Sequence, residues 1–354
     1  MNRYQIQLLR ALKTGPKSFW KLLDAQDDHI RSFVSRLRAL IEEEIVTYRG
    51  GVFLLTDKGR EFAAGISTFK ETTCSSCRGG YLSDFSPEAR EKYSRLIEGR
   101  PLPNPNFDQG FMSVEDVFAR VAFMYQRGDL EWQKILILGD DDLFSLALAA
   151  TGLPEEITVL EVDRRLVQFI ENQAQAEDLP IRVLEYNACS IYPLEEHFFD
   201  VFITDPVESE KGLKVTLSRG AQGLRTDGAL YFGLTTIESS WKKWYKIEKM
   251  LLEMNLVVTD ILRRFSAYPD LDNQFDETYY NQMLIRRLLP GIEVPLPADT
   301  DWFRSSLVRC EAVATPSPLV VEAVEFDSDF YLDQETLATP LVEKDKNFFE
   351  NFLK

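Results

Sequence analysis

The chain has 354 residues and a formal net charge of −17, with 45% hydrophobic and 27% charged residues. This composition is typical of a globular protein with two or three domains, and no apolar run suits a membrane span or signal peptide, so we expect a cytoplasmic location. The acidic balance disfavours attraction of the whole protein to nucleic acid and favours cationic partners, and four cysteines in so long a chain do not form a disulfide framework.

Residues 1–66 differ from the rest of the chain and predict a separate N-terminal domain. This segment carries 11 basic and 8 acidic side chains, a net charge of +3, so the remainder carries −20. Apolar spacing predicts three helices, the third over residues 30–43, and residues 45–55 predict a β-hairpin. This order is typical of a winged helix-turn-helix. DNA binding would use arginines of the third helix, namely Arg31, Arg36 and Arg38. The weak basic balance favours a dimerisation or substrate-covering module instead.

The remaining chain predicts an α/β domain between two less regular segments. Residues 67–130 are expected to connect the domains and to include a helix over residues 113–127. Residues 131–290 alternate apolar runs with helical stretches, which predicts a Rossmann-like sheet of the class I methyltransferase type with helices on both faces. The expected strands are residues 134–138, 157–162, 181–186, 200–204, 229–234, 256–262 and 282–286. Residues 291–354 are irregular and acidic, which predicts a C-terminal tail or lid.

Three consecutive aspartates, Asp140, Asp141 and Asp142, follow Gly139 at the end of the first expected strand. In such folds the ligand lies outside the carboxyl ends of the strands. Three carboxylates there would repel an anionic ligand and attract a cationic one. They would also oppose the carboxylate of S-adenosylmethionine. Decarboxylated S-adenosylmethionine lacks that group and ends in a primary ammonium, so it fits the charge pattern better.

The second and third expected strands also end in polar residues. Glu161 and Asp163 lie about twenty residues after the first turn, where dinucleotide and methyl-donor folds place the carboxylate that binds ribose hydroxyls. Surface acids at a strand end are the alternative interpretation. Asn187 follows the third strand and could hydrogen-bond an adenine edge, or could be a plain turn residue.

The fourth expected strand leads into Asp205-Pro206-Val207-Glu208. Amino-directed adenine and cytosine methyltransferases carry an acidic or amide residue, two prolines and an aromatic residue here, and the aromatic ring stacks on the flipped base. In this chain Val207 stands for the second proline and Glu208 for the ring. A carboxylate cannot stack on a base but can bind an ammonium group, so the loop indicates an aliphatic amine substrate.

These segments resemble the branched-chain polyamine synthases. The resemblance rests on the turn at residues 139–143, the loop at 205–208, the run at 231–235 with Glu238-Ser239-Ser240, the Phe107-Asp108-Gln109 segment, the N-terminal winged helix and the acidic C-terminal tail. It implies transfer of aminopropyl groups from decarboxylated S-adenosylmethionine to the secondary amine of spermidine, which makes branched polyamines and releases methylthioadenosine. Val207 departs from the family, which more often has a second proline there.

The resemblance also implies roles for individual residues. Asp141 corresponds to the catalytic carboxylate, which would accept a proton from the attacking amine and hold the amine in line. Asp205 and Glu208 correspond to the amine-facing loop, and Asp140, Asp142 and Glu208 would bind the flanking ammonium groups. The expected contacts of the donor are Gly139, Glu161, Asp163, Asn187 and Gln109. Family analogy also implies a homodimer.

We expect no metal and no cofactor beyond this cosubstrate. Cys74 and Cys77 have half of a zinc-ribbon pattern, but a structural zinc site needs four ligands and the other cysteines and histidines are scattered.

Two alternative functions remain open. One is an S-adenosylmethionine-dependent methyltransferase that acts on an amine or nucleic acid, which the triple-aspartate turn and Glu208 disfavour. The other is a winged-helix regulator that senses a polyamine or nucleoside, which the weak basic balance of residues 1–66 disfavours.

Overall fold

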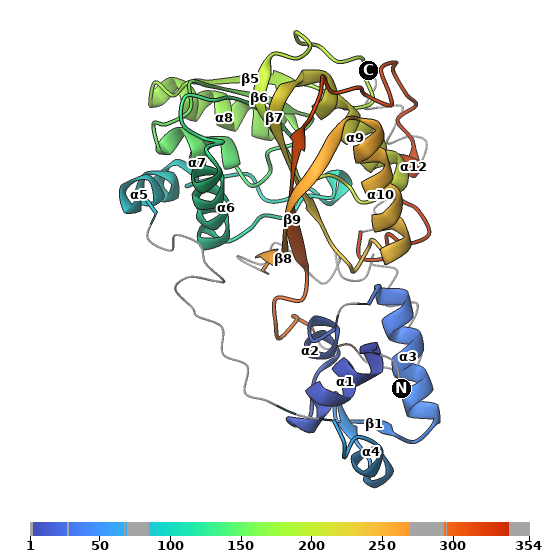
Figure 1. Cartoon of the computed structure of the whole chain (residues 1–354). Helices are drawn as coiled ribbons and strands as arrows, with labels where there is room; N and C mark the ends of the chain where they lie inside the picture. Colours follow the sequence, from blue (N-terminus) through green and yellow to red (C-terminus); the bar gives the residue numbers. More distant parts are fainter. Residues whose placement is uncertain are drawn as a thin grey trace.

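The computed structural model describes residues 3–26, 28–66, 68, 85–269, 294 and 296–339. Within these residues, an N-terminal group of short helices with a hairpin lies beside a large α/β unit (Figure 1). No helix in these ranges is long and apolar enough to span a bilayer. The predicted strand at 282–286 and the cysteines at 74 and 77 lie outside them.

The N-terminal unit contains the elements that its sequence predicts. Its elements are α1 (Arg3–Lys13), α2 (Phe19–Asp24), α3 (Ile30–Glu42), β1 (Val46–Arg49), β2 (Val52–Leu55) and α4 (Asp57–Phe62). The two strands pair antiparallel. Apolar residues of α3 recur at helical spacing, and Phe33, Leu37 and Leu40 are fully buried in a core of this unit. Three helices followed by a hairpin therefore confirm the predicted order of elements.

The α/β unit is built on a seven-stranded sheet. Its strands are β3 (Lys134–Leu138), β4 (Glu156–Glu161), β5 (Ile181–Glu185), β6 (Phe199–Thr204), β7 (Leu224–Leu234), β8 (Leu256–Ala267) and β9 (Arg304–Ala312). Their order is β5-β4-β3-β6-β7-β9-β8. The first five are parallel, whereas β9 runs antiparallel to both of its neighbours. The sheet is therefore mostly parallel, as predicted.

Helices cover both faces of this sheet (Figure 1). The helices of this unit are α5 (Pro87–Leu96), η1 (Pro105–Phe107), α6 (Val114–Arg127), α7 (Phe144–Ala150), α8 (Arg164–Ala176), α9 (Glu210–Gly223), α10 (Trp241–Glu253) and α12 (Ser328–Tyr331). Because side chains alternate along a strand, Ile135 and Ile137 of β3 pack in one core with α6 and α7. Leu136 and Leu138 pack in the opposite core with α9 and α10. The unbroken apolar run of β3 reflects burial on both faces.

Two predicted boundaries are wrong. Helix α6 was assigned to a connector, but its residues Val117, Phe118 and Val121 share a core with the sheet, so the α/β unit begins before residue 131. Residues 304–312 were assigned to an acidic tail, but they form β9 inside the sheet. Buried polar side chains explain the second error. Arg309 of β9 is only 7% exposed because Asp129 pairs with it, so the strand lacks an apolar pattern.

The order of strands locates the functional edge of the sheet. The chain moves from β3 to β4 and β5 on one side and then returns to β6 and β7 on the other. A crevice opens at the carboxyl ends of the strands where the order reverses, and ligands of open α/β sheets bind there. The turns after β3, β4, β6 and β7 therefore meet at one edge.

Candidate active site

A cavity of about 190 Å³ opens at this edge of the sheet. Seven carboxylate side chains line it, namely Asp108, Asp141, Glu161, Asp205, Glu208, Glu238 and Asp301. None of the described residues that line it is a lysine, arginine or histidine. An aromatic wall of Tyr268, Trp302 and Phe303 completes it. The cavity therefore suits an elongated molecule with both positive charges and methylene groups.

Asp141 is the residue of the triple-aspartate turn that faces the cavity. The turn begins at Gly139, whose φ of +75° is accessible to glycine without strain. The Oδ2 atom of Asp141 accepts a hydrogen bond of 3.0 Å from the backbone N–H of Gly110. Burial and the neighbouring carboxylate of Asp142 raise the pKa of Asp141 well above its ordinary value. Asp141 is thus an acidic group whose proton affinity is closer to that of an amine.

Asp140 and Asp142 are placed differently from the prediction. The carboxylate of Asp140 accepts the N–H of Ser145 at 3.3 Å, at the start of α7. Asp142 accepts the N–H of Met112 at 2.6 Å. Neither lines the cavity. Of the three consecutive aspartates, only Asp141 therefore lines the cavity. The other two hold the turn and the loop before α6 in position.

Glu161 faces the cavity, whereas Asp163 does not. The Glu161 carboxylate accepts backbone N–H groups of Asp140, Val162 and Asp163 at 2.7–2.8 Å, so it ties the turns after β3 and β4 together. Asp163 instead caps α8 and forms an ion pair with Arg165. It also accepts a hydrogen bond of 3.2 Å from Nε2 of Gln109. Gln109 lines the cavity, and Asp163 supports it from behind.

Asn187 lines a second pocket of about 100 Å³ that adjoins the first. The two pockets share Gly139, Asp205 and Val207. The second pocket is lined largely by apolar and aromatic side chains, among them Leu138, Leu160, Tyr186, Phe326, Phe330 and Tyr331. The Oδ1 atom of Asn187 accepts the N–H of Cys189 at 2.9 Å. The acidic pocket suits a cationic group, and the adjoining apolar pocket suits a flat ring.

Asp205 lines the cavity, and one of its two carboxylate oxygens is buried and unpaired within the part of the chain that the structure describes. Its Oδ2 atom accepts hydrogen bonds from Arg120 at 2.7 Å and from the Tyr268 hydroxyl at 2.8 Å. Its Oδ1 atom is buried and has no hydrogen-bond partner among the described residues. A Cβ atom at Gly233 would lie 2.0 Å from this Oδ1, so the position needs glycine. A buried acceptor without a partner is costly unless a ligand satisfies it.

Glu208 and Glu238 are two further carboxylates of the cavity lining. Glu208 accepts the Thr235 N–H at 2.6 Å and the Ser239 hydroxyl at 2.7 Å. Glu238 accepts the N–H groups of Ala338 and Thr339 at 2.6 and 2.7 Å. Burial raises the pKa of Glu208 to about 7. Burial, with Asp108 and Glu208 nearby, raises the pKa of Glu238 to about 8.

Several cavity residues were not proposed as site residues from the sequence. Glu238 and Asp108 were noted only as parts of family motifs, and Asp301, Tyr268 and Trp302 were not considered. Glu238 lies in the loop after β7, which ends at Leu234, so its position near the carboxyl end of a strand could have indicated it. The others lie in segments that only the fold brings to the cavity.

The clustered carboxyl groups predict that the unliganded protein is more stable at mildly acidic pH. The pKa values of Asp140, Asp142 and Glu208 are raised to about 7, and that of Glu238 to about 8, chiefly by burial. Unfolded carboxyl groups titrate near pH 4, so between pH 4 and 8 the folded state binds more protons and its stability falls as the pH rises. Burial lowers the pKa of His29, so below about pH 6.5 this residue makes stability rise with pH. It is one group against the four carboxyl groups, so the fall in stability should dominate.

We expect the melting temperature to fall from pH 5 to pH 8, and spermidine to raise it more at pH 8, where the carboxylates are ionised. Thermal melts over a pH series, with sodium chloride at matched ionic strength as the control, measure both effects. A melting temperature that rises over this range, or an equal effect of spermidine at both ends, contradicts the expectation.

A Rossmann-like sheet with an acidic cavity at its carboxyl edge fits one class of protein, an α/β transferase, and the comparisons with known proteins show that class. The chain belongs to the branched-chain polyamine synthase family, because the model of the C-terminal domain of branched-chain polyamine synthase A matches residues 88–338. An N(4)-bis(aminopropyl)spermidine synthase of Thermococcus kodakarensis is 34% identical over 331 residues, which cover 90% of each chain. One of Thermus thermophilus is 38% identical over 247 residues, covering 68% of this chain and 69% of its own.

A solved structure is similar over almost the whole length. The branched-chain polyamine synthase C9 mutein from Thermus thermophilus, in complex with N4-aminopropylspermidine and 5'-methylthioadenosine, is 31% identical and has a TM-score of 0.83. The similarity covers 94% of this chain and 92% of that one. The similarity therefore includes the N-terminal unit as well as the sheet.

Proposed function

We propose that this protein is an aminopropyltransferase that moves aminopropyl groups from decarboxylated S-adenosylmethionine to the secondary amine of spermidine. The products are branched-chain polyamines and methylthioadenosine. The observation that carries the proposal is a cavity lined by seven carboxylates and, among its described lining residues, no basic side chain. The names of the relatives in the same family support it.

The reaction needs a neutral amine held in line with the sulfonium. In the first transfer the secondary nitrogen attacks the aminopropyl carbon that is bonded to sulfur. The C–S bond breaks, its electron pair moves to sulfur, and methylthioadenosine leaves as a neutral thioether. The proton lost by the nitrogen passes to a carboxylate. A second transfer would start from the resulting tertiary amine, give a quaternary ammonium and release no proton.

Asp141 is the proposed proton acceptor. Its raised pKa brings its proton affinity closer to that of an amine, which favours proton transfer between them. Its hydrogen bond from Gly110 fixes the carboxylate on the cavity wall. The carboxylates of Asp205, Glu208 and Glu238 would bind the flanking ammonium groups. Asp140 and Asp142 would act by holding the turn.

The two adjoining pockets suit the parts of the donor. Glu161 and Gln109 would face the ribose, and Asn187 would face the adenine in the apolar pocket. Intact S-adenosylmethionine would place its carboxylate among acidic side chains in a partly desolvated cavity, which is unfavourable. Its decarboxylated form replaces that repulsion by attraction of an ammonium group.

Offering the protein spermidine with each of the two sulfonium donors tests the proposal. Mass spectrometry should find aminopropyl additions on spermidine with the decarboxylated donor and none with S-adenosylmethionine. Methylated spermidine alone would instead establish a methyltransferase and overturn the proposal.

We also infer that the N-terminal unit is a winged-helix module that supports the cavity wall. Trp20 of α2 stacks on Trp302 with ring centroids 4.6 Å apart, and Trp302 lines the cavity. Two arginines that would be needed for DNA have protein partners, since Arg31 donates to the carbonyl of Gln334 and Arg36 pairs with Asp28. We expect no gel shift of duplex DNA at low salt. A shift that is lost in a truncation starting at residue 68 would support a regulator.

The homodimer and the cytoplasmic location remain predictions.

A further inference from the structure

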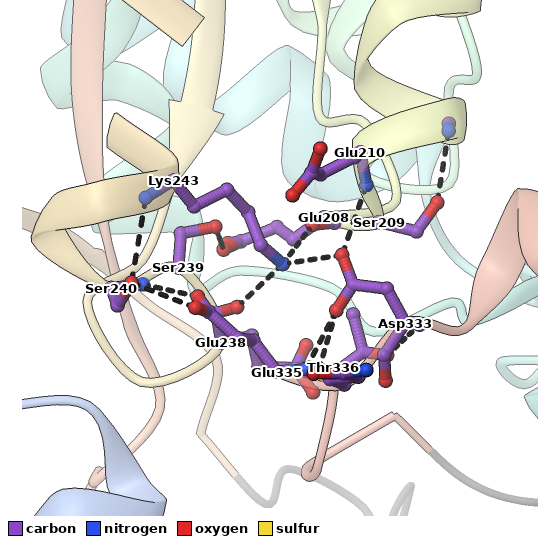
Figure 2. Close-up of polar contacts among 12 residues, drawn as sticks. Glu208, Ser209, Glu210, Glu238, Ser239, Ser240, Lys243, Asp333, Glu335 and Thr336 are labelled. Atoms are coloured by element: carbon purple, nitrogen blue, oxygen red, sulfur yellow. Dashed lines mark hydrogen bonds and ion pairs between the residues drawn. The ribbon is translucent and has the colours of Figure 1, made fainter. Parts of the chain in front are cut away.

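Lys243, in the first turn of α10, is a buried lysine with three partners from three segments (Figure 2). Its Nζ atom donates to the carbonyl of Glu208 at 2.8 Å and to the carbonyl of Glu238 at 2.9 Å. It also forms an ion pair of 2.8 Å with Asp333. The side chain is only 2% exposed, so the three N–H bonds of the ammonium are matched by three acceptors away from solvent.

Two of these partners are the backbone of cavity residues. Glu208 lies in the loop after β6 and Glu238 in the loop after β7, and the side chains of both line the cavity. Lys243 therefore holds the main chain at the two residues whose carboxylates face the proposed substrate. Its positive charge also opposes the rise in the pKa of Glu208 that burial causes.

The third partner anchors a C-terminal segment, residues 333–339. Asp333 accepts the N–H groups of Glu335 and Thr336 at 2.7 and 3.1 Å, which fixes a turn (Figure 2). Although burial opposes it, the ion pair with Lys243 holds the pKa of Asp333 below its ordinary value. Beyond this turn, Ala338 and Thr339 line the cavity and donate their N–H groups to the Glu238 carboxylate. One ammonium thus joins both acidic loops to the segment that covers them.

We infer that Lys243 is a positioning residue for the polyamine acceptor, because it couples the docking of residues 333–339 to the placement of the Glu208 and Glu238 carboxylates. The inference rests on the proposed function. The pocket proposed for the donor contains Asn187 and is lined in part by Phe330 and Tyr331. These two residues pack in a core of their own. Loss of Lys243 should therefore affect the acceptor far more than the donor.

The test compares Lys243→Met with Lys242→Met, an exposed neighbour on the same helix that removes the same charge. In Lys243→Met, we expect the KM for spermidine to rise by about tenfold or more while the KM for the donor changes little. We expect faster hydrogen exchange at the amides of Ala338 and Thr339, with the amides of β3 still protected. Lys242→Met should match the wild type in both measurements.

Asp333→Asn provides a second route if Lys243→Met does not fold. It keeps the ammonium and its two carbonyl partners and weakens the links of Asp333 to Lys243 and to the N–H of Glu210, so it should change the same two measurements in the same direction. Wild-type acceptor KM with wild-type exchange at residues 338–339 would overturn the inference. An equal rise in both KM values with faster exchange throughout the sheet would also overturn it. If the proposed function is wrong, the wild type itself transfers no aminopropyl group, and the exchange measurement still tests the link.

Discussion

Replacing Asp141 with asparagine is expected to lower kcat for aminopropyl transfer by about 100- to 10,000-fold, the usual contribution of a positioned general base. The asparagine Oδ1 can still accept the N–H of Gly110, so the turn should keep its position. Folding should not suffer, because the substitution removes a buried charge from among like charges. Steady-state kinetics and thermal melts of the purified variant measure the two effects.

A control for this variant is Asp260→Asn, which removes the same charge from β8, where Asp260 pairs with Arg127 outside the cavity. It should leave kcat within experimental error of the wild type. Wild-type turnover in Asp141→Asn would remove this residue from the mechanism. A large loss of thermal stability in Asp141→Asn would instead mean that its carboxylate is structural.

Asp205→Ala should show a large effect on both stability and acceptor binding. It leaves the buried Arg120 without its carboxylate, and breaking a buried ion pair in this way costs about 3–5 kcal/mol of the free energy of unfolding. It also removes a carboxylate from the lining of the cavity. A lost hydrogen bond to a charged group is worth about 1.5–3 kcal/mol, so the KM for spermidine should rise by about 10- to 100-fold.

The chain offers a matched pair elsewhere in the same sheet. Asp129 pairs with the buried Arg309, with side chains 13% and 8% exposed, against 19% and 5% for Asp205 and Arg120. Asp129→Ala should therefore also destabilise the protein, although Arg309 keeps an ion pair with Glu311, and should leave the KM for spermidine unchanged. Chemical denaturation and kinetics of both variants separate the two contributions. An equal rise in the KM for spermidine in both variants would mean that general destabilisation, and not the loss of a cavity carboxylate, weakens spermidine binding.

Much of the sheet could be predicted because its central strands are buried on both faces. The apolar runs at 134–138 and 200–204 have few other interpretations, and the structure places β3 and β6 at these positions. The strand β9 could not be found in this way, since its Ser305, Ser306 and Arg309 are buried against polar partners. The partners of these polar side chains, such as Arg120 for Ser305 and Asp129 for Arg309, lie far away in the sequence, so no local pattern reveals the strand.

The site was predictable where it follows strand ends and not where distant segments complete it. Gly139, Asp141, Glu161 and Asp205 face one cavity because parallel strands end at the same edge. The directions of Asp140 and Asp142 depend on hydrogen bonds to Ser145 and Met112, which no spacing reveals. Asp301 and Thr339 reach the cavity only through tertiary packing. The acidic character of the cavity was therefore predicted correctly, although two of the residues named for it lie behind it.

A crystal structure with spermidine and methylthioadenosine bound is the most direct measurement of the central claim. The account predicts that the secondary nitrogen of spermidine lies within about 2.6–3.2 Å of the Asp141 carboxylate. It also predicts that the flanking ammonium groups contact Asp205 on one side and Glu208 or Glu238 on the other, with adenine beside Asn187. A polyamine bound outside this cavity, or bound within it while Asp141 makes no contact, would contradict the account.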